Sequence, residues 1–173
     1  MAALDGLGLA EFNALPGDRA EEALLACCSS RCWAVAVAAG RPYRSAEEMY
    51  QAADTALAAL SEADIDDALA GHPRIGERAA LGHSEWSNRE QAGVAGAADD
   101  TRAALAEGNR TYEARFGHVY LVCATGKSPN ELLAILKTRL VNDPATERRL
   151  VRGELGKINR IRLERMLGEG TTQ

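Results

Sequence analysis

The first residue at which we expect chemistry is His72, in a stretch rich in glycine and proline. The run His72-Pro-Arg-Ile-Gly-Glu77 places an imidazole on a loop between two predicted helices, and such loops often carry functional groups. Histidine titrates near neutral pH, so its ring can donate a hydrogen bond, accept one or carry charge. His83 and His118 have no comparable setting, and we assign them no role.

A second polar group opens the next predicted helix. Ser87-Asn-Arg-Glu90 has the spacing of a capping box, in which the two side chains satisfy each other's free backbone amides, and Gln91 follows directly. Capping alone explains this pattern. However, the helix start is close in sequence to His72, and the spacing is compatible with one cleft that receives both.

The third candidate is an arginine within the apolar face of the last predicted helix. At 100° per residue that face carries Val151, Leu155, Ile158 and Met166. Arg162 falls among them, whereas Arg160 and Leu167 point to the opposite side. Since arginine is seldom buried without a partner, Arg162 forms a buried ion pair or grips an oxygen acceptor in a pocket with its planar fork. The alternative is a stem that only passes the core on its way to solvent.

The cysteines indicate packing more than chemistry. They are Cys27, Cys28, Cys32 and Cys123. Cys28 and Cys32 have helical spacing and could offer two thiolates to a metal, but no second Cys or His pair follows at the spacing of a zinc site. We therefore expect all four to be small buried side chains and predict no metal.

Composition limits the class of protein. The chain has 173 residues, of which 46% are hydrophobic and 5% aromatic, and a net charge of −5. It has no basic stripe for nucleic acid and no apolar run long enough to cross a membrane. Neither Met1–Asp5 nor residues 170–173 resemble a secretory signal or an anchor, so we expect a cytoplasmic protein. Abundant alanine and few β-branched or aromatic residues predict an all-α fold.

Capping residues, Gly and Pro predict about eight helices in a single domain that spans residues 1–173. The expected helices are 11–15, 18–28, 32–39, 45–60, 61–70, 87–114 with a break near Gly108, one that opens at Ser128 with Pro129 in its first position, and 143–167. The expected caps are Asp18, Ser61 and Asp143, together with capping boxes at Ser45–Glu48 and Ser128–Glu131, and Gly40 is the expected stop of the third helix. The stretch 71–86 is the least helical. Residues 116–123 resemble a strand, but Gly117 and Gly126 indicate a short extended segment or linker.

Two motifs stand out together. They are His72-Pro-Arg-Ile-Gly76 and Trp86-Ser-Asn-Arg-Glu-Gln-Ala-Gly93. Further motifs follow over nearly the whole chain: Glu11-Phe-Asn13, Cys28-x-x-x-Cys-Trp33, Arg115-Phe-Gly117, Val122-Cys-Ala-Thr-Gly-Lys-Ser128, Asn142-Asp-Pro144 and Lys157-Ile-Asn-Arg-Ile-Arg-Leu163. In this order they closely resemble the OHCU decarboxylase family of urate breakdown, where OHCU is 2-oxo-4-hydroxy-4-carboxy-5-ureidoimidazoline.

The resemblance implies an all-α, cofactor-free and usually dimeric carboxy-lyase that converts OHCU to (S)-allantoin and CO2. It implies catalytic roles for His72 and Glu90. It also implies substrate contacts by Pro73, Ser87, Gln91, Val119 and Arg162. This chain departs from family members that have an aromatic residue after Phe-Gly, because His118 stands there, followed by Val119 and Tyr120. That segment borders the family's pocket.

Two other classes of function remain open. A metal-dependent hydrolase would use His72, Glu90 and a thiolate and lose activity with a chelator, but the chain has no His-Glu-x-x-His cluster. A catalytically silent helical interaction module would show no turnover and no rise in melting temperature with ligand. An arginine within the apolar face of the last helix argues against it.

Overall fold

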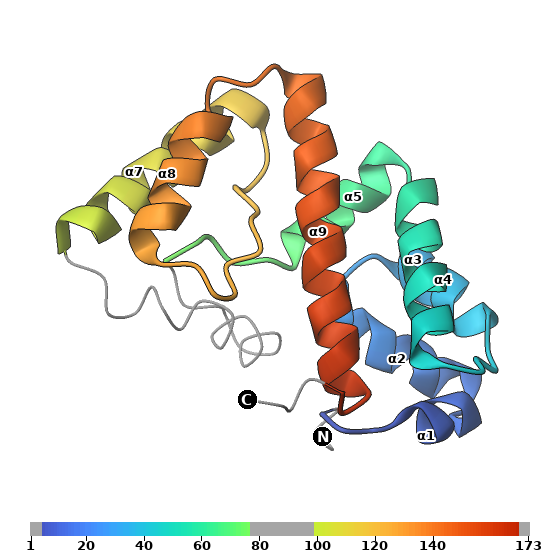
Figure 1. Cartoon of the computed structure of the whole chain (residues 1–173). Coiled ribbons are helices and arrows are strands. Elements are labelled where there is room, and N and C mark those ends of the chain that lie inside the picture. Colours follow the sequence, from blue (N-terminus) through green and yellow to red (C-terminus); the bar gives the residue numbers. More distant parts are fainter. Residues whose placement is uncertain (1–4, 77–98, 170–173) are drawn as a thin grey trace. The chain divides into compact units, whose positions relative to one another are not determined.

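The computed structural model describes residues 5–76 and 99–169, which form eight α-helices and contain no strand (Figure 1). The all-α prediction is confirmed. The helices are α1 (Leu9–Ala14), α2 (Gly17–Cys27), α3 (Arg31–Ala39), α4 (Ala46–Ala59), α5 (Glu62–Ala70), α7 (Asp99–Phe116), α8 (Pro129–Arg139) and α9 (Pro144–Met166). None of the helices in these two ranges has the length and hydropathy that a membrane span requires.

The chain divides into two compact units. Unit 1 consists of residues 1–68 and 156–173, and unit 2 consists of residues 69–155. The helix α9 therefore gives its first half to unit 2 and its second half to unit 1. The prediction of a single domain over residues 1–173 stays a prediction.

Serine caps begin several helices where the sequence predicts them. The Ser128 box is complete: Ser128 Oγ accepts from Glu131 N at 3.2 Å, Glu131 Oε2 accepts from Ser128 N at 2.7 Å, and Pro129 opens α8. Ser61 caps α5 in the same reciprocal way with Asp64. The first residue of α9 follows Asp143, whose Oδ1 accepts from Thr146 N at 2.9 Å.

Other boundaries differ from the predictions. Ser45 accepts from Glu48 N, but the Glu48 carboxylate turns to the backbone and side chain of Arg44, so the expected box at α4 is only half formed. Asp18 is not a cap, because α2 begins at Gly17 and places Asp18 in its first turn. α3 begins at Arg31, one residue before the predicted start at Cys32, with Ser30 as its cap, and Gly40 ends that helix as expected.

In unit 1, α3 packs against both α2 and α4. Trp33 of α3 is fully buried and donates from Nε1 to Ala53 O of α4 at 3.0 Å. The second half of α9 adds Ile158, Leu163 and Met166 to the buried residues. Leu167 follows α9 and is also buried, so its predicted outward position is wrong.

The two ends of unit 1 meet at the last turn of α9. Gly6 N donates to Arg165 O at 3.0 Å and Leu7 N donates to Met166 O at 2.7 Å. Tyr50 of α4 donates from its hydroxyl to the Glu169 carboxylate at 2.8 Å. These contacts fix the end of α9 to elements early in the chain.

In unit 2, α7 packs along α8, as Figure 1 shows. The core of this unit is formed by Ile75, Leu105, Tyr112, Tyr120, Val122, Ala124, Leu132 and Leu136. α7 continues through Gly108, so the predicted break there is wrong. The glycine instead permits close packing, because a Cβ at Gly108 would lie within 2.4 Å of the Leu136 Cδ2 atom.

Two helical glycines are expected to respond to alanine with opposite signs. Gly153→Ala, where a Cβ meets nothing within 4 Å, should raise the free energy of unfolding by about 0.5–1 kcal/mol because alanine orders more easily in a helix. Gly108→Ala should lower it by about 1–3 kcal/mol through the clash with the buried Leu136 side chain. Urea denaturation of both variants measures the difference. If Gly108→Ala instead raised the free energy of unfolding, the Leu136 side chain would be able to move aside without a loss of stability.

Candidate active site

His72 lies two residues beyond α5, in unit 2. Its backbone N donates to Leu69 O at 3.0 Å, and the residue is only 9% exposed. The imidazole is therefore buried, whereas the imidazole of a histidine on a plain surface loop would be solvated. Pro73 beside it is half-buried.

The loop that carries His72 is fixed to α7. Arg74 donates from Nε and Nη2 to the two carboxylate oxygens of Glu113 at 2.5 and 3.0 Å, and this pair holds the pKa of the Glu113 carboxyl below its usual range. Asn109 donates from Nδ2 to Ile75 O at 2.9 Å, and the Ile75 side chain enters the core of unit 2. These anchors limit the freedom of the loop and so of His72.

Arg162 is buried in unit 1, within the apolar face that the sequence predicts. It is 4% exposed, and its Nη1 donates to Cys27 O at 3.1 Å, at the end of α2. Arg160 lies on a different side of α9 and is exposed by 38%, with Glu47 at 3.1 Å and Glu164 at 2.9 Å. The predicted helical phase is confirmed, and a stem that only passes the core is the wrong interpretation of Arg162.

Sequence analysis missed Asn159, which is also buried in this part of α9. It is 3% exposed, and neither Oδ1 nor Nδ2 has a hydrogen-bond partner among the described residues. Its polar neighbour is Cys28: burial raises the pKa of that thiol, while the Ser30 backbone, the Asn159 amide and the Arg162 charge act in the opposite direction. The signal in the sequence was its spacing, three residues before Arg162 on the same helix face.

Val119 lies in unit 2, in the extended segment between α7 and α8. Residues 117–124 have no partner strand in the described part of the chain, which agrees with the prediction of an extended segment rather than a sheet. Val119 itself is half-buried, and residues 120–124 are buried. His118 contacts Val119 O through Nδ1 at 3.1 Å and lies edge-on to the Tyr112 ring.

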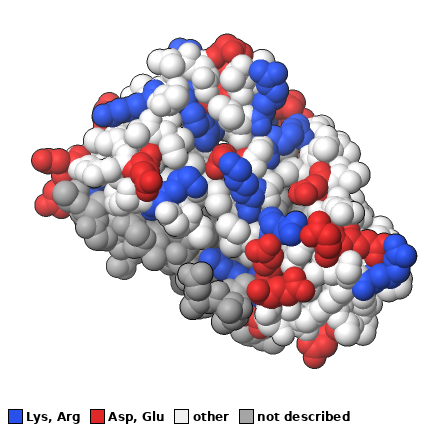
Figure 2. Space-filling model, in the orientation of Figure 1, with Lys and Arg blue, Asp and Glu red and all other residues white. Residues whose placement is uncertain are grey.

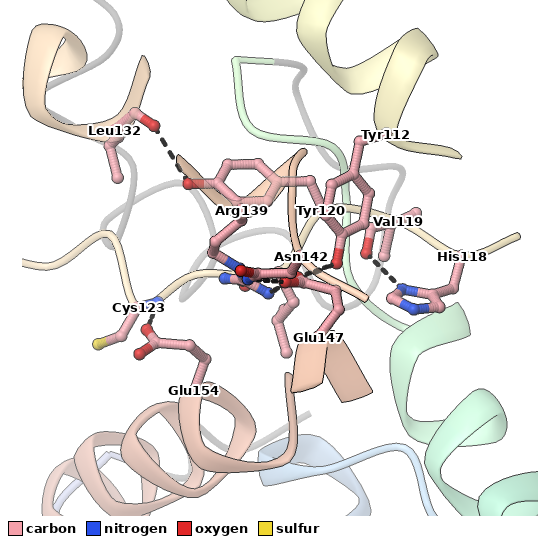
Figure 3. Close-up of polar contacts among 11 residues, drawn as sticks. Tyr112, His118, Val119, Tyr120, Cys123, Leu132, Arg139, Asn142, Glu147 and Glu154 are labelled. Carbon is pink, nitrogen blue, oxygen red and sulfur yellow. Dashed lines mark hydrogen bonds and ion pairs between the residues drawn. The ribbon is translucent and has the colours of Figure 1, made fainter. Parts of the chain in front are cut away.

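A buried ion pair, which sequence analysis also missed, lies against this segment (Figure 3). Arg139 at the end of α8 donates from Nε and Nη2 to Glu147 Oε1 at 2.7 and 2.5 Å. The Glu147 carboxylate is fully buried and also accepts from the Tyr112 hydroxyl and from Asn142 Nδ2. Burial acts to raise the pKa of Glu147, but these three donors outweigh it and hold the pKa below its usual range.

The remaining predicted site residues fall outside the described ranges. Ser87, Glu90 and Gln91 lie in residues 77–98, as does the capping box predicted there. Of the others, His72, Pro73 and Val119 belong to unit 2 and Arg162 to unit 1. Their roles stay predictions.

Metal-ligating residues do not cluster in residues 5–76 and 99–169, where no group of three or more His, Cys, Asp or Glu is placed to hold an ion. Cys27, Cys28 and Cys123 are buried as expected, but Cys32 is exposed, so that prediction is wrong for one of the four. Cys32 lies on the first turn of α3 beside Asp64, whose hydrogen bond and charge raise the pKa of the thiol.

Charges of both signs are mixed on the face drawn in Figure 2, where lysine and arginine side chains alternate with aspartate and glutamate. Several charged side chains of the described residues form local pairs, such as Arg19 with Glu22 and Arg110 with Glu107. Pairs of this kind keep a helical surface hydrated but add little to the free energy of unfolding.

Comparison with known proteins identifies the family. The family model of OHCU decarboxylase matches residues 13–164. The chain is 29% identical over 148 residues to the uric acid degradation bifunctional protein TTL of Arabidopsis thaliana, covering 83% of this chain and 46% of that protein. It is also 29% identical over 140 residues to the 2-oxo-4-hydroxy-4-carboxy-5-ureidoimidazoline decarboxylase of Amia calva, covering 78% of this chain and 80% of that one.

A solved structure agrees. A crystal structure of OHCU decarboxylase in the presence of (S)-allantoin matches with a TM-score of 0.75 and 26% identity over 85% of this chain and 97% of that one. The fold is thus that of an α-helical carboxy-lyase. The chain belongs to the OHCU decarboxylase family, and the resemblance inferred from its motifs is confirmed. It spans less than half the length of the bifunctional Arabidopsis protein but four fifths of the Amia calva enzyme.

Proposed function

We propose that this chain decarboxylates 2-oxo-4-hydroxy-4-carboxy-5-ureidoimidazoline to (S)-allantoin and CO2 in urate degradation. The observation that supports this most is the family match over residues 13–164, together with the fold shared with an OHCU decarboxylase structure determined in the presence of (S)-allantoin. The proposal includes no metal and no organic cofactor.

The substrate's own chemistry explains why no cofactor is proposed. Its carboxylate and hydroxyl share one ring carbon, next to a ring C=N. When CO2 leaves, the adjacent C=N takes up the electron pair, so the substrate supplies the electron sink that a cofactor provides in other decarboxylases. The resulting enol-like intermediate must be protonated on one face of the neighbouring carbon to give (S)-allantoin.

The protein then has to orient the substrate, exclude water and direct a proton. In our proposal His72 hydrogen-bonds to or deprotonates the hydroxyl and guides the departing carboxylate, with Pro73 in the pocket wall. Glu90 holds ring or ureido N–H groups and takes part in the proton transfer. Burial of His72 is consistent with this role, because hydrogen bonds and charges act more strongly away from water.

The remaining groups would bind the polar oxygens of the substrate. Gln91 and Arg162 grip the ring carbonyl and the ureido group, Ser87 adds a hydroxyl and Val119 an apolar wall. A buried guanidinium such as that of Arg162 suits this task, because its flat fork donates to two oxygen acceptors at once.

A coupled assay tests the proposed function. Urate oxidase and hydroxyisourate hydrolase generate the unstable substrate in situ, and circular dichroism follows the appearance of (S)-allantoin. We expect this protein to accelerate formation of the S enantiomer over the spontaneous reaction, with no change after dialysis against EDTA. A racemic product at the spontaneous rate would contradict the proposal, and an EDTA loss restored by zinc would favour a hydrolase.

The proposal also includes a cellular location and an oligomeric state. We propose a cytoplasmic homodimer, as the family resemblance implies. Light scattering after size exclusion measures the mass in solution and would overturn the dimer if it gave 18.5 kDa, the mass of one chain. Cell fractionation tests the location.

Substitution of two arginines of α9 distinguishes a residue that binds substrate from one that lies on the surface. Arg162→Lys keeps the charge but loses the fork, so KM and the Kd for (S)-allantoin should rise about tenfold, the effect of losing one charged hydrogen bond. Arg160→Lys, on the exposed side with Glu47 and Glu164, should change neither by much. Equal effects of the two substitutions on Kd would rule out substrate binding by Arg162.

A further inference from the structure

The extended segment between α7 and α8 is unusual because its backbone is buried without a sheet. Tyr120, Leu121, Val122, Cys123 and Ala124 are each at most 6% exposed. A buried backbone N–H or C=O needs a hydrogen-bond partner, and a sheet would normally supply it. Side chains from other elements of unit 2 take that place here.

Two charged side chains hold adjacent parts of this backbone. Arg139 of α8 donates from Nη1 to Leu121 O at 2.5 Å, and Glu154 of α9 accepts from Cys123 N at 2.7 Å (Figure 3). Hydrogen bonds to charged groups are stronger than those between neutral groups, so each contact fixes the backbone firmly.

Further contacts fix the rest of the segment. The Tyr120 hydroxyl donates to Leu132 O of α8 at 3.1 Å, and its ring lies 5.4 Å from the Tyr112 ring and 5.1 Å from the Arg139 guanidinium. Lys127 donates from Nζ to Cys123 O at 2.8 Å. Val119, whose side chain stays half-exposed, is the residue directly before this fixed stretch.

The orientation of Arg139 is itself fixed. Two of its nitrogens are bound to Glu147, and the Tyr112 hydroxyl donates to the same carboxylate. The third nitrogen is therefore aimed at Leu121 O by the ion pair. This arrangement does more than neutralise a buried charge, because it connects α7, α8 and the first turn of α9 to one carbonyl of the segment.

We propose that Arg139 and Glu154 are positioning residues that hold residues 117–124 so that Val119 forms a rigid wall of the substrate pocket. This inference rests on the proposed function. Neither side chain is expected to touch substrate. Each acts through the backbone of the segment, and the Tyr112–Glu147 contact acts through Arg139.

The test uses Glu154, since it is half-buried and its replacement leaves the Arg139–Glu147 pair intact. In Glu154→Ala we expect KM to rise roughly tenfold or more while kcat changes by only a few-fold, because displaced walls weaken substrate binding. Amide exchange at Cys123 should speed up, with no faster exchange in α7 or α8. Glu154→Gln, whose amide oxygen still accepts from Cys123 N, should restore most of the affinity.

Glu107→Ala is the matched control, because it removes an exposed carboxylate of unit 2 that forms an ion pair with the exposed Arg110 and lies outside the segment. Its KM and Cys123 exchange should stay at wild-type values. The inference is overturned if Glu154→Ala leaves KM unchanged in an active protein, or if Glu154→Ala and Glu154→Gln are equally impaired. Unchanged amide exchange at Cys123 in Glu154→Ala would also overturn the inference, because it would show that Glu154 does not hold the segment. A wild-type protein without turnover would overturn the proposed function as well.

Discussion

Replacing His72 by asparagine is expected to lower kcat by roughly 10²–10⁴-fold, the usual contribution of a general acid or base. Asparagine can still form a hydrogen bond but cannot exchange a proton near neutral pH. The loop should keep its place, since Arg74 with Glu113 and Asn109 with Ile75 anchor it independently of the substituted side chain. The coupled assay with (S)-allantoin as product measures the loss.

Because His72 is buried, its replacement also has to be checked for folding. The melting temperature of His72→Asn should stay close enough to that of the wild type that the protein is fully folded in the assay. His83→Asn is the matched control, since we assign that histidine no role, and it should keep wild-type kcat. If folded His72→Asn turned over at the wild-type rate, His72 would not be catalytic.

The largest expected effect on stability is that of Glu147→Gln, which should lower the free energy of unfolding by about 3–5 kcal/mol, because it leaves the buried Arg139 charge without its carboxylate. Glutamine has nearly the same size, so no cavity contributes. Glu107→Gln breaks an ion pair of the same 2.5 Å length between exposed side chains and should have a far smaller effect. Urea denaturation at neutral pH compares the two.

The pH dependence of this difference has a definite sign. The pKa of Glu147 is lowered in the folded protein, so its contribution to stability is complete above its unfolded pKa of about 4.3 and is lost as the pH falls through the folded value. The gap between wild type and Glu147→Gln should therefore be constant from about pH 6 upward and narrow below about pH 4. A gap that widened in acid would contradict the assigned ionisation of Glu147.

Helix boundaries were predictable where a short-range rule decides them. The Ser128 box, the Ser61 and Asp143 caps and the stop at Gly40 depend on residues within four positions of each other. Gly108 shows where local rules fail. A glycine inside a helix predicts a break, yet the chain needs it because α8 brings Leu136 against that position, and no pattern within α7 reveals the neighbour.

The same distinction holds for the candidate site. Helical phase alone placed Arg162 on the buried face of α9, and the structure confirms its burial. The Arg139–Glu147 pair escaped prediction because its partners come from different helices, and an arginine at the end of α8 looks like an ordinary favourable charge at a helix C-terminus. Its burial depends on the Tyr112 and Tyr120 rings, which are contributed by other elements.

The hydrogen bonds of Gly6 and Leu7 to the end of α9 have a consequence for biosynthesis. A ribosome releases residues 6–7 long before residues 165–166, so the segment before α1 cannot form these hydrogen bonds until almost the entire described chain has emerged. Residues 69–155 are contiguous and can fold first. Nascent α2, α3 and α4 can pack against one another early, but Cys27 O does not meet Arg162, and Tyr50 does not meet Glu169, until the end of translation.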